Sequence, residues 1–314
     1  EDDSVWLFGD SFVATGNEKN RQSASFVRNT VAIQSGADPR TASIQYFWKE
    51  SGSGEPASFF DEGDDFWYWP AGGARAADGA LLIFLHKVEA REGGLGFAIV
   101  GYSVAKVANP DALPDEWRVE LHDASSPAFD AVPACAMPGE DGGVFAIAVS
   151  QRGIHAGMLM RYGADEIASG SFGSPEWWTG DEVGWVSARS LGANRPPVVI
   201  DDAGAECSLH FDRRLGAYVH VASYGFGASD IGVRTSISAT GPWSDPVLVY
   251  HPPESDAARP FVYAGKAHPE FAAPNDDELL ITYAANSFEP DDLLSPDGEK
   301  SLYWPRIVRV RLTR

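Results

Sequence analysis

Three carboxylates in otherwise apolar segments are the residues of this sequence best suited to acid–base chemistry. Asp10 ends the segment WLFGD, Glu206 opens ECSLHFD, and Glu270 lies in KAHPEF, two residues after His268. An acidic side chain in such a segment is costly to bury unless it is paired or has a function. Repulsion between two close carboxyl groups raises one pKa, so that one group stays protonated while the other is ionised. Such a pair can protonate a leaving oxygen and supply a nucleophile or base, as glycoside hydrolysis requires.

Asp10 and Glu206 also have structural interpretations. Asp10 follows Gly9 in a turn-like Gly-Asp-Ser sequence, where its carboxylate would bond to the backbone. Glu206 would instead pair with Arg213 or Arg214 across a hairpin. We favour the catalytic interpretation for Asp10, and both interpretations stay open for Glu206 because a glutamate at the start of an apolar strand is unusual.

A second set of residues is interpreted as substrate-binding. It consists of Arg28, Asn29, Trp67, Trp69, His210, Tyr224 and His268. Trp67 and Trp69 share one face of a strand and should therefore point inward together. A flat aromatic face complements the C–H face of a sugar ring, so these tryptophans are candidate sugar platforms.

Three other members of this set have two interpretations each. His210 lies four residues after Glu206 and shares its face in a regular strand, either as a substrate contact or as a core histidine. Arg28 and Asn29 either complete a polar site beside Asp10 or fasten a loop to the first strands.

Strands must position these residues. The dominant pattern alternates every second residue and is broken repeatedly by Gly, Pro, Asn or Asp, which is typical of β-strands. The strands fall into five groups that open at Trp6, Phe66, Ala131, Glu206 and Lys266. The period is roughly 60 to 75 residues, and such a repeat buries both faces of its sheets when the sheets form a closed ring. We predict an all-β protein, a five-bladed β-propeller formed by one domain, residues 1–314, in preference to a β-sandwich.

The ring brings together residues that are distant in sequence. The first strand of each blade lines a central channel, so Asp10, Glu206 and Glu270 are expected to converge there, with Asp64 and Asp65 nearby. The first and last groups each lack a strand, which predicts that the ring closes between the N- and C-terminal segments. No pair of histidines has the spacing of a zinc site, but calcium bound by channel carboxylates and a histidine is a candidate cofactor.

Two cysteines fall on inner strands of adjacent blades. Cys135 is in the third group and Cys207 is in the fourth. Either a disulfide joins these blades or both residues are buried free thiols.

The amino-acid composition excludes several classes of binding partner. The 314 residues include 24 Lys plus Arg and 45 Asp plus Glu, so 24 − 45 gives a net charge of −21, which repels nucleic acid and anionic lipid. No segment approaches the roughly 20 apolar residues of a membrane span. The first residues, EDDSVW, include neither an initiator Met nor a signal-like apolar run. We expect a soluble, trimmed, secreted or cell-surface protein whose partner is a polysaccharide or oligosaccharide.

Several motifs in order resemble a known family. WLFGDS is followed by VRNTVAI, then by GPWSDP at a blade end, and AHPEF leads into LLITYAANS. This order resembles the five-bladed propeller family of the endo-D-arabinanases that act on mycobacterial arabinogalactan and lipoarabinomannan. More loosely, it is similar to the arabinanase, xylosidase and invertase propellers. The resemblance covers the inner strands of blades one, four and five. It implies a glycan hydrolase with an essential aspartate that matches Asp10, and it assigns no role to Glu206 or Glu270.

The residues and the resemblance together predict a hydrolase of arabinofuranosyl linkages that acts within D-arabinan. Two alternatives on the same fold are an exo-acting furanosidase and a glycoside phosphorylase, and phosphate use would draw on Lys266 and Arg28. An alternative of another class is a non-catalytic glycan-binding propeller, whose acids only orient sugar hydroxyls.

Overall fold

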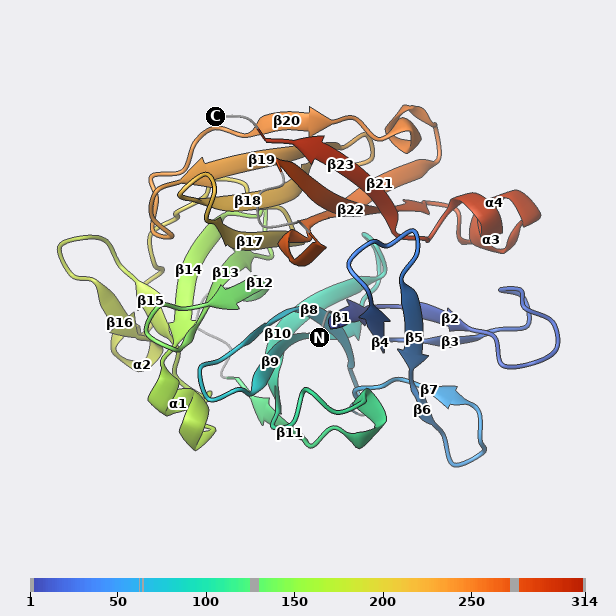
Figure 1. Cartoon of the computed structure of the whole chain (residues 1–314), viewed down its shortest axis with the longest axis horizontal. Coiled ribbons are helices and arrows are strands. Elements are labelled where there is room, and N and C mark those ends of the chain that lie inside the picture. The colour runs from blue at the N-terminus through green and yellow to red at the C-terminus, as the bar shows by residue number, and fades with distance from the viewer. Residues whose placement is uncertain (1–2, 62, 64, 125–129, 272–276, 313–314) are drawn as a thin grey trace.

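Five antiparallel sheets surround a common centre, so the chain is an all-β, five-bladed β-propeller, as predicted (Figure 1). The computed structural model describes residues 3–61, 63, 65–124, 130–271 and 277–312. Within each sheet the strands follow chain order from the centre outward. No helix in these residues is long and apolar enough to cross a membrane.

Blades two and four have four strands each. Blade two contains β8 (Trp67–Arg75), β9 (Leu81–Ala90), β10 (Phe97–Val107) and β11 (Val119–Asp123). Blade four contains β17 (Cys207–Asp212), β18 (Ala217–Tyr224), β19 (Asp230–Ser236) and β20 (Val247–Tyr250). β9 is buried along most of its length. Because neighbouring blades cover both faces of the sheet, this strand is an apolar run and does not alternate.

Blade three has five strands and two short helices. Its strands are β12 (Ala131–Pro138), β13 (Val144–Ser150), β14 (Gly157–Tyr162), β15 (Glu176–Trp178) and β16 (Trp185–Ser187). Helix α1 (Ala164–Ser169) connects β14 to β15, and α2 (Ala188–Leu191) follows β16.

Blades one and five have three strands each. Blade one contains β1 (Asp3–Phe8), β4 (Thr30–Ser35) and β5 (Ser43–Phe47), and blade five contains β21 (Pro260–Ala267), β22 (Glu278–Ser287) and β23 (Arg306–Arg311). Two ribbons accompany blade one, made by β2 (Ser11–Val13) with β3 (Ser25–Val27) and by β6 (Lys49–Glu50) with β7 (Pro56–Ala57). The remaining elements are short helices: η1 (Pro114–Glu116), η2 (Pro253–Asp256), η3 (Pro269–Phe271), α3 (Pro290–Leu294) and α4 (Pro296–Ser301).

Apolar clusters join neighbouring blades at four of the five junctions. Buried side chains from facing sheets form one cluster each between blades one and two, two and three, three and four, and four and five. Among the described residues no such cluster joins blade five to blade one. That junction therefore depends on other contacts.

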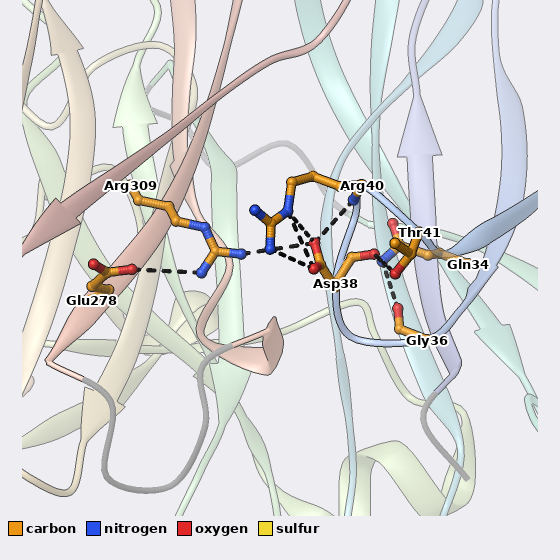
Figure 2. A network of polar contacts seen from close by, with 7 residues as sticks. All are labelled: Gln34, Gly36, Asp38, Arg40, Thr41, Glu278 and Arg309. Atoms are coloured by element: carbon orange, nitrogen blue, oxygen red, sulfur yellow. Dashed lines mark hydrogen bonds and ion pairs between the residues drawn. The ribbon is translucent and has the colours of Figure 1, made fainter.

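The ring closes between blades one and five through side chains. Among the described strands β1 pairs only with β4, and β23 pairs only with β22, so no sheet is shared across the junction. Figure 2 shows the link: Asp38 binds Arg40 at 2.7 Å and lies 4.0 Å from Arg309 on β23. Arg309 also lies 3.6 Å from Glu278 on β22. The two short blades are adjacent, as predicted, and an exposed ion-pair network connects them.

Candidate active site

A channel of about 2460 Å³ lies at the centre of the ring, and residues from all five blades line it. Eight of the ten predicted site residues are in its wall: Asp10, Arg28, Trp67, Trp69, Glu206, His210, His268 and Glu270. Asn29 and Tyr224 are not in the wall.

Asp10 follows the end of β1 and faces blade two. Its Oδ1 accepts a hydrogen bond from the indole Nε1 of Trp69 at 2.7 Å, and Nη1 of Arg28 lies 3.5 Å from Oδ2. The Asp10 side chain is 15% exposed. Two donors therefore hold this carboxylate as an acceptor at the channel wall.

Arg28 and the two tryptophans form one cluster beside Asp10. The guanidinium carbon of Arg28 lies 4.3 Å from the ring centroid of Trp67, a cation–π contact. The rings of Trp67 and Trp69 meet edge to face at 6.0 Å, and both line the channel, as the alternation in β8 predicts.

Glu206 directly precedes β17 and lies in a different environment. Burial raises its pKa, and the positive charges of Lys266 and His155 oppose this increase in part. Among the described residues no side chain or backbone group hydrogen-bonds to its carboxyl group. The ammonium of Lys266 donates to the carbonyl of Ala71 at 2.9 Å and so spans the channel from blade five to blade two. Glu206 can therefore hold a proton at a higher pH than a solvated glutamate can.

Asp10 and Glu206 act on the same two phenols. Both carboxylates raise the pKa of Tyr263 on β21 and that of Tyr303, in addition to the larger effect of burial. Tyr263 and Tyr303 also line the channel. Two carboxyl groups from blades one and four therefore both line the channel and both act on Tyr263 and Tyr303. We call Asp10, Glu206 and their neighbours the Asp10–Glu206 region.

Glu270 lies elsewhere, in η3 beyond the end of β21. It bonds to Nδ1 of His268 at 2.9 Å, and Nε2 of His268 contacts Oγ1 of Thr282 at 2.7 Å. The Glu270 side chain is 45% exposed. All three predicted acids line the channel, and Glu270 is the one whose carboxyl group bonds to a histidine. Glu270, His268 and their neighbours are the His268–Glu270 region.

His210 belongs to the His268–Glu270 region. Burial lowers its pKa to about 4, against the opposing effect of Asp212 and Glu270, and its buried Nδ1 has no partner among the described residues. The ring of His268 stacks on Trp6 with centroids 4.7 Å apart. Both histidines line the channel.

Asn29 has a structural role in place of the predicted substrate contact. It is fully buried, and its Nδ2 donates to the carbonyls of Phe60 at 3.2 Å and Tyr68 at 3.0 Å. Its Oδ1 accepts from the backbone N–H of Phe60 at 2.7 Å. Of its two interpretations, fastening a loop is the one that fits this geometry.

Tyr224 is a packing residue as well. Its hydroxyl accepts a hydrogen bond from Nε of Arg234 at 3.1 Å. Its ring covers Gly232, where an added Cβ would lie 2.6 Å from the ring. The predicted contact of Tyr224 with a substrate is therefore not supported by its position.

Two residues of the Asp10–Glu206 region, Tyr263 and Tyr303, are not predicted as site residues by the sequence, which suggests Lys266 only as a phosphate ligand. Lys266 could have been placed in the channel because it shares strand parity with His268. Tyr303 lies in a loop with a positive φ of 63°, which no periodic pattern indicates.

The remaining predictions concern cysteines, further acids and metal. Cys135 and Cys207 are free thiols with Sγ atoms 3.3 Å apart, one of the two alternatives considered. Asp65 is exposed and outside the channel wall, and Asp64 lies outside the described residues.

The described residues contain no group of three or more His, Cys, Asp or Glu that could hold a metal ion.

Residues 1–312 match the model of a family described as a domain of unknown function, DUF5005. No protein of curated function matches the chain. A "putative hydrolase" from Bacteroides ovatus ATCC 8483 has 14% identity and a TM-score of 0.72, over 98% of this chain and 82% of that one.

An exo-β-1,3-galactanase from Phanerochaete chrysosporium is also similar. Its structure with galactose has 12% identity and a TM-score of 0.54. A variant with β-1,3-galactotriose has 13% identity and a TM-score of 0.53. Each comparison covers 98% of this chain and 60% of the galactanase chain. At these identities the likeness establishes the propeller fold, and the arabinanase resemblance stays a prediction.

Proposed function

The chain belongs to the DUF5005 family, and from its channel we propose that it is a glycoside hydrolase that cleaves arabinofuranosyl linkages within D-arabinan. One observation carries the proposal: two channel carboxyl groups have opposite environments. Asp10 accepts from Trp69 and faces Arg28, whereas burial raises the pKa of Glu206. Unlike environments of this kind separate the roles of acid and base in glycosidases.

The two residues take complementary parts in the reaction. Protonated Glu206 donates its proton to the glycosidic oxygen as the C–O bond breaks. Ionised Asp10 either attacks the anomeric carbon or takes a proton from the water that attacks it, and the carboxyl separation in the substrate complex selects between these routes. The aromatic faces of Trp67 and Trp69 beside Asp10 are suited to stack on the sugar.

Two further considerations support a carbohydrate substrate. The galactanase with the similar fold was crystallised with galactose and galactotriose. The net charge of −21 favours a neutral polymer over an anionic one. The choice of arabinan depends on the resemblance of WLFGDS and the later motifs to endo-D-arabinanases. With such a substrate we propose a location outside the cell or on its surface.

A non-catalytic glycan-binding protein is the second candidate, and the contacts of Asp10 favour it. Both oxygens of that carboxylate already face donors, Trp69 and Arg28. A phosphorylase has less support because Lys266 donates to the Ala71 carbonyl and Arg28 faces Asp10, so both candidate phosphate ligands are engaged.

New reducing ends test the proposal. The unmodified protein is incubated with D-arabinan, L-arabinan, xylan, fructan and β-1,3-galactan, and product sizes are followed over time. We expect cleavage of D-arabinan into oligosaccharides of mixed length, and loss of cleavage with retained binding in Asp10→Asn and Glu206→Gln. Asp65→Asn, an exposed carboxyl group outside the channel, is the matched control. Binding of D-arabinan without cleavage by the unmodified protein would establish the second candidate instead.

A further inference from the structure

A row of four aromatic rings leads from solvent into the channel. The ring of Phe226 lies 5.8 Å from that of Phe288, Phe288 lies 4.6 Å from Phe261, and Phe261 lies 5.5 Å from Tyr263. All four residues line the channel. We call them the aromatic row. They come from the β18–β19 turn, the end of β22 and strand β21, so blades four and five build it together.

The outer end of the row is held in solvent by its backbone. Phe226 is 74% exposed, between Gly225 with φ 112° and Gly227 with φ 84°. A Cβ on Gly225 would lie 2.5 Å from the carbonyl oxygen of Ala228, so only glycine fits there. The carbonyl of Gly227 accepts from the N–H of Val262 at 3.2 Å, which anchors the turn to β21. Exposed apolar side chains that gather in this way mark ligand-binding surfaces.

The inner end of the row reaches the carboxylates. Tyr263 is one of the two tyrosines whose pKa both Asp10 and Glu206 raise. The Asn286 side chain hydrogen-bonds to the Tyr263 hydroxyl. The row therefore continues into the Asp10–Glu206 region, and a polar group accompanies its last ring.

We propose that the aromatic row is an extended binding site for a neutral polysaccharide chain, so that the substrate is a polymer held on one side of the cleavage point. This inference rests on the proposed function and adds the binding site that holds the polymer beside the cleavage point. Ring faces stack on the C–H faces of sugars, and none of the four residues carries a charge that would select an ion. The 46% exposure of Phe288 and the 74% exposure of Phe226 leave ring surface for such stacking.

Binding to polymers and to short sugars separates the row from the catalytic pair. Phe226→Ala and Phe288→Ala are prepared in the Glu206→Gln background, and dissociation constants are measured for D-arabinan, L-arabinan, xylan and β-1,3-galactan and for their trisaccharides. We expect about 5- to 30-fold weaker binding of one polymer and unchanged binding of its trisaccharide. Ile237→Ala, 86% exposed on blade four and outside the channel wall, is the matched control.

The outcomes of this test are independent of hydrolysis. If both phenylalanine variants bind the polymers as tightly as Ile237→Ala does, or if none of the four polymers binds the parent protein, the inference is overturned. Weaker polymer binding in a protein that cleaves nothing would support the row and refute the hydrolase. Cleavage by the unmodified protein, with unchanged polymer affinity in the phenylalanine variants, would support the hydrolase and refute the role of the aromatic row. An occupant of another class, such as an apolar peptide, corresponds to the result in which no polymer binds.

Discussion

The Asp10–Glu206 and His268–Glu270 regions of the channel contain similar residues, but the carboxyl groups in them have different partners. Glu270 bonds to His268, and His268 bonds in turn to Thr282, so that this acid belongs to a chain that ties η3 to β22. Glu206 has no hydrogen bond to its carboxyl group among the described residues, and burial raises its pKa. The carboxyl group of Glu206 is therefore available to donate a proton to a substrate, whereas that of Glu270 is engaged with His268.

Burial also shifts the pKa of one residue in each region in opposite directions. Burial of Glu206 favours the protonated, neutral acid, and burial of His210 favours the deprotonated, neutral base with a pKa of about 4. The first effect creates a proton donor. The second removes a charge and leaves a packing residue at neutral pH.

The largest expected effect compares the two glutamates. Glu206→Gln removes the proton donor and should lower kcat by about 10²- to 10⁴-fold, whereas Glu270→Gln should leave kcat unchanged. Initial rates on the cleaved polymer measure both. The pH profile of kcat adds a check, since activity that needs protonated Glu206 should fall as pH rises through its elevated pKa. An equal loss in Glu270→Gln would break the comparison between the regions.

Acid should destabilise the protein through its buried histidines. Burial lowers the pKa of His86 and His210 to about 4 and that of His220 to about 3. Between about pH 6.5 and these values the unfolded state binds protons that the folded state does not, so stability falls as pH falls. His86 and His210 each contribute about 3 kcal/mol over this interval, and His220 contributes about 5 kcal/mol. Unfolding by urea between pH 7 and pH 4 measures the loss.

Variants identify the histidines as the source of this loss. His210→Gln should make the dependence on pH shallower. His251 provides the control of opposite sign: it is exposed, and hydrogen bonds to Asp230 and Asp256 raise its pKa. Its stabilising effect is present at low pH and is lost as pH rises, so His251→Gln should make the acid loss slightly steeper. If His210→Gln left the pH dependence of the unfolding free energy unchanged, this would argue against a neutral buried His210 in the His268–Glu270 region.

The substitution Asn29→Ala tests whether this residue, next to Arg28, contributes to stability and not to substrate binding. Asn29→Ala leaves the carbonyls of Phe60 and Tyr68 and the N–H of Phe60 without their partners, and should lower the free energy of unfolding by about 2–4 kcal/mol. KM should not change. Asn194→Ala, at an exposed position, should stay within about 0.5 kcal/mol of the parent. A large increase in KM with unchanged stability would restore Asn29 to the substrate site.

The fold was predictable because alternation and turn residues are local signals. Five repeats of short strands are readable one segment at a time, and a period of two places Trp67 and Trp69 on the channel side of β8. Asp10 and Glu206 followed from the same logic, since each lies at one end of an inner strand.

The roles of other residues depend on contacts that local patterns do not contain. Asn29 hydrogen-bonds to carbonyl groups 31 and 39 residues away in the sequence. Its burial therefore depends on how the segment from β7 to β8 packs against it. The hydrogen bond of His268 to Thr282 depends on the fold of blade five. Because the other ring nitrogen of His268 bonds to Glu270, this contact also fixes the position of Glu270. Lys266 reaches a carbonyl in blade two only because the ring is closed.

The smallest expected effect concerns the ion pair that closes the ring beside the His268–Glu270 region. Arg309 lies on the surface, 4.0 Å from Asp38 and 3.6 Å from Glu278, and solvent screens both contacts (Figure 2). Arg309→Ala should therefore lower the free energy of unfolding by less than about 1 kcal/mol. His268→Ala removes two hydrogen bonds and the stack on Trp6 and should cost more. If Arg309→Ala were the more damaging change in urea unfolding, blades one and five would be joined mainly by charge, and the stacked region would be dispensable.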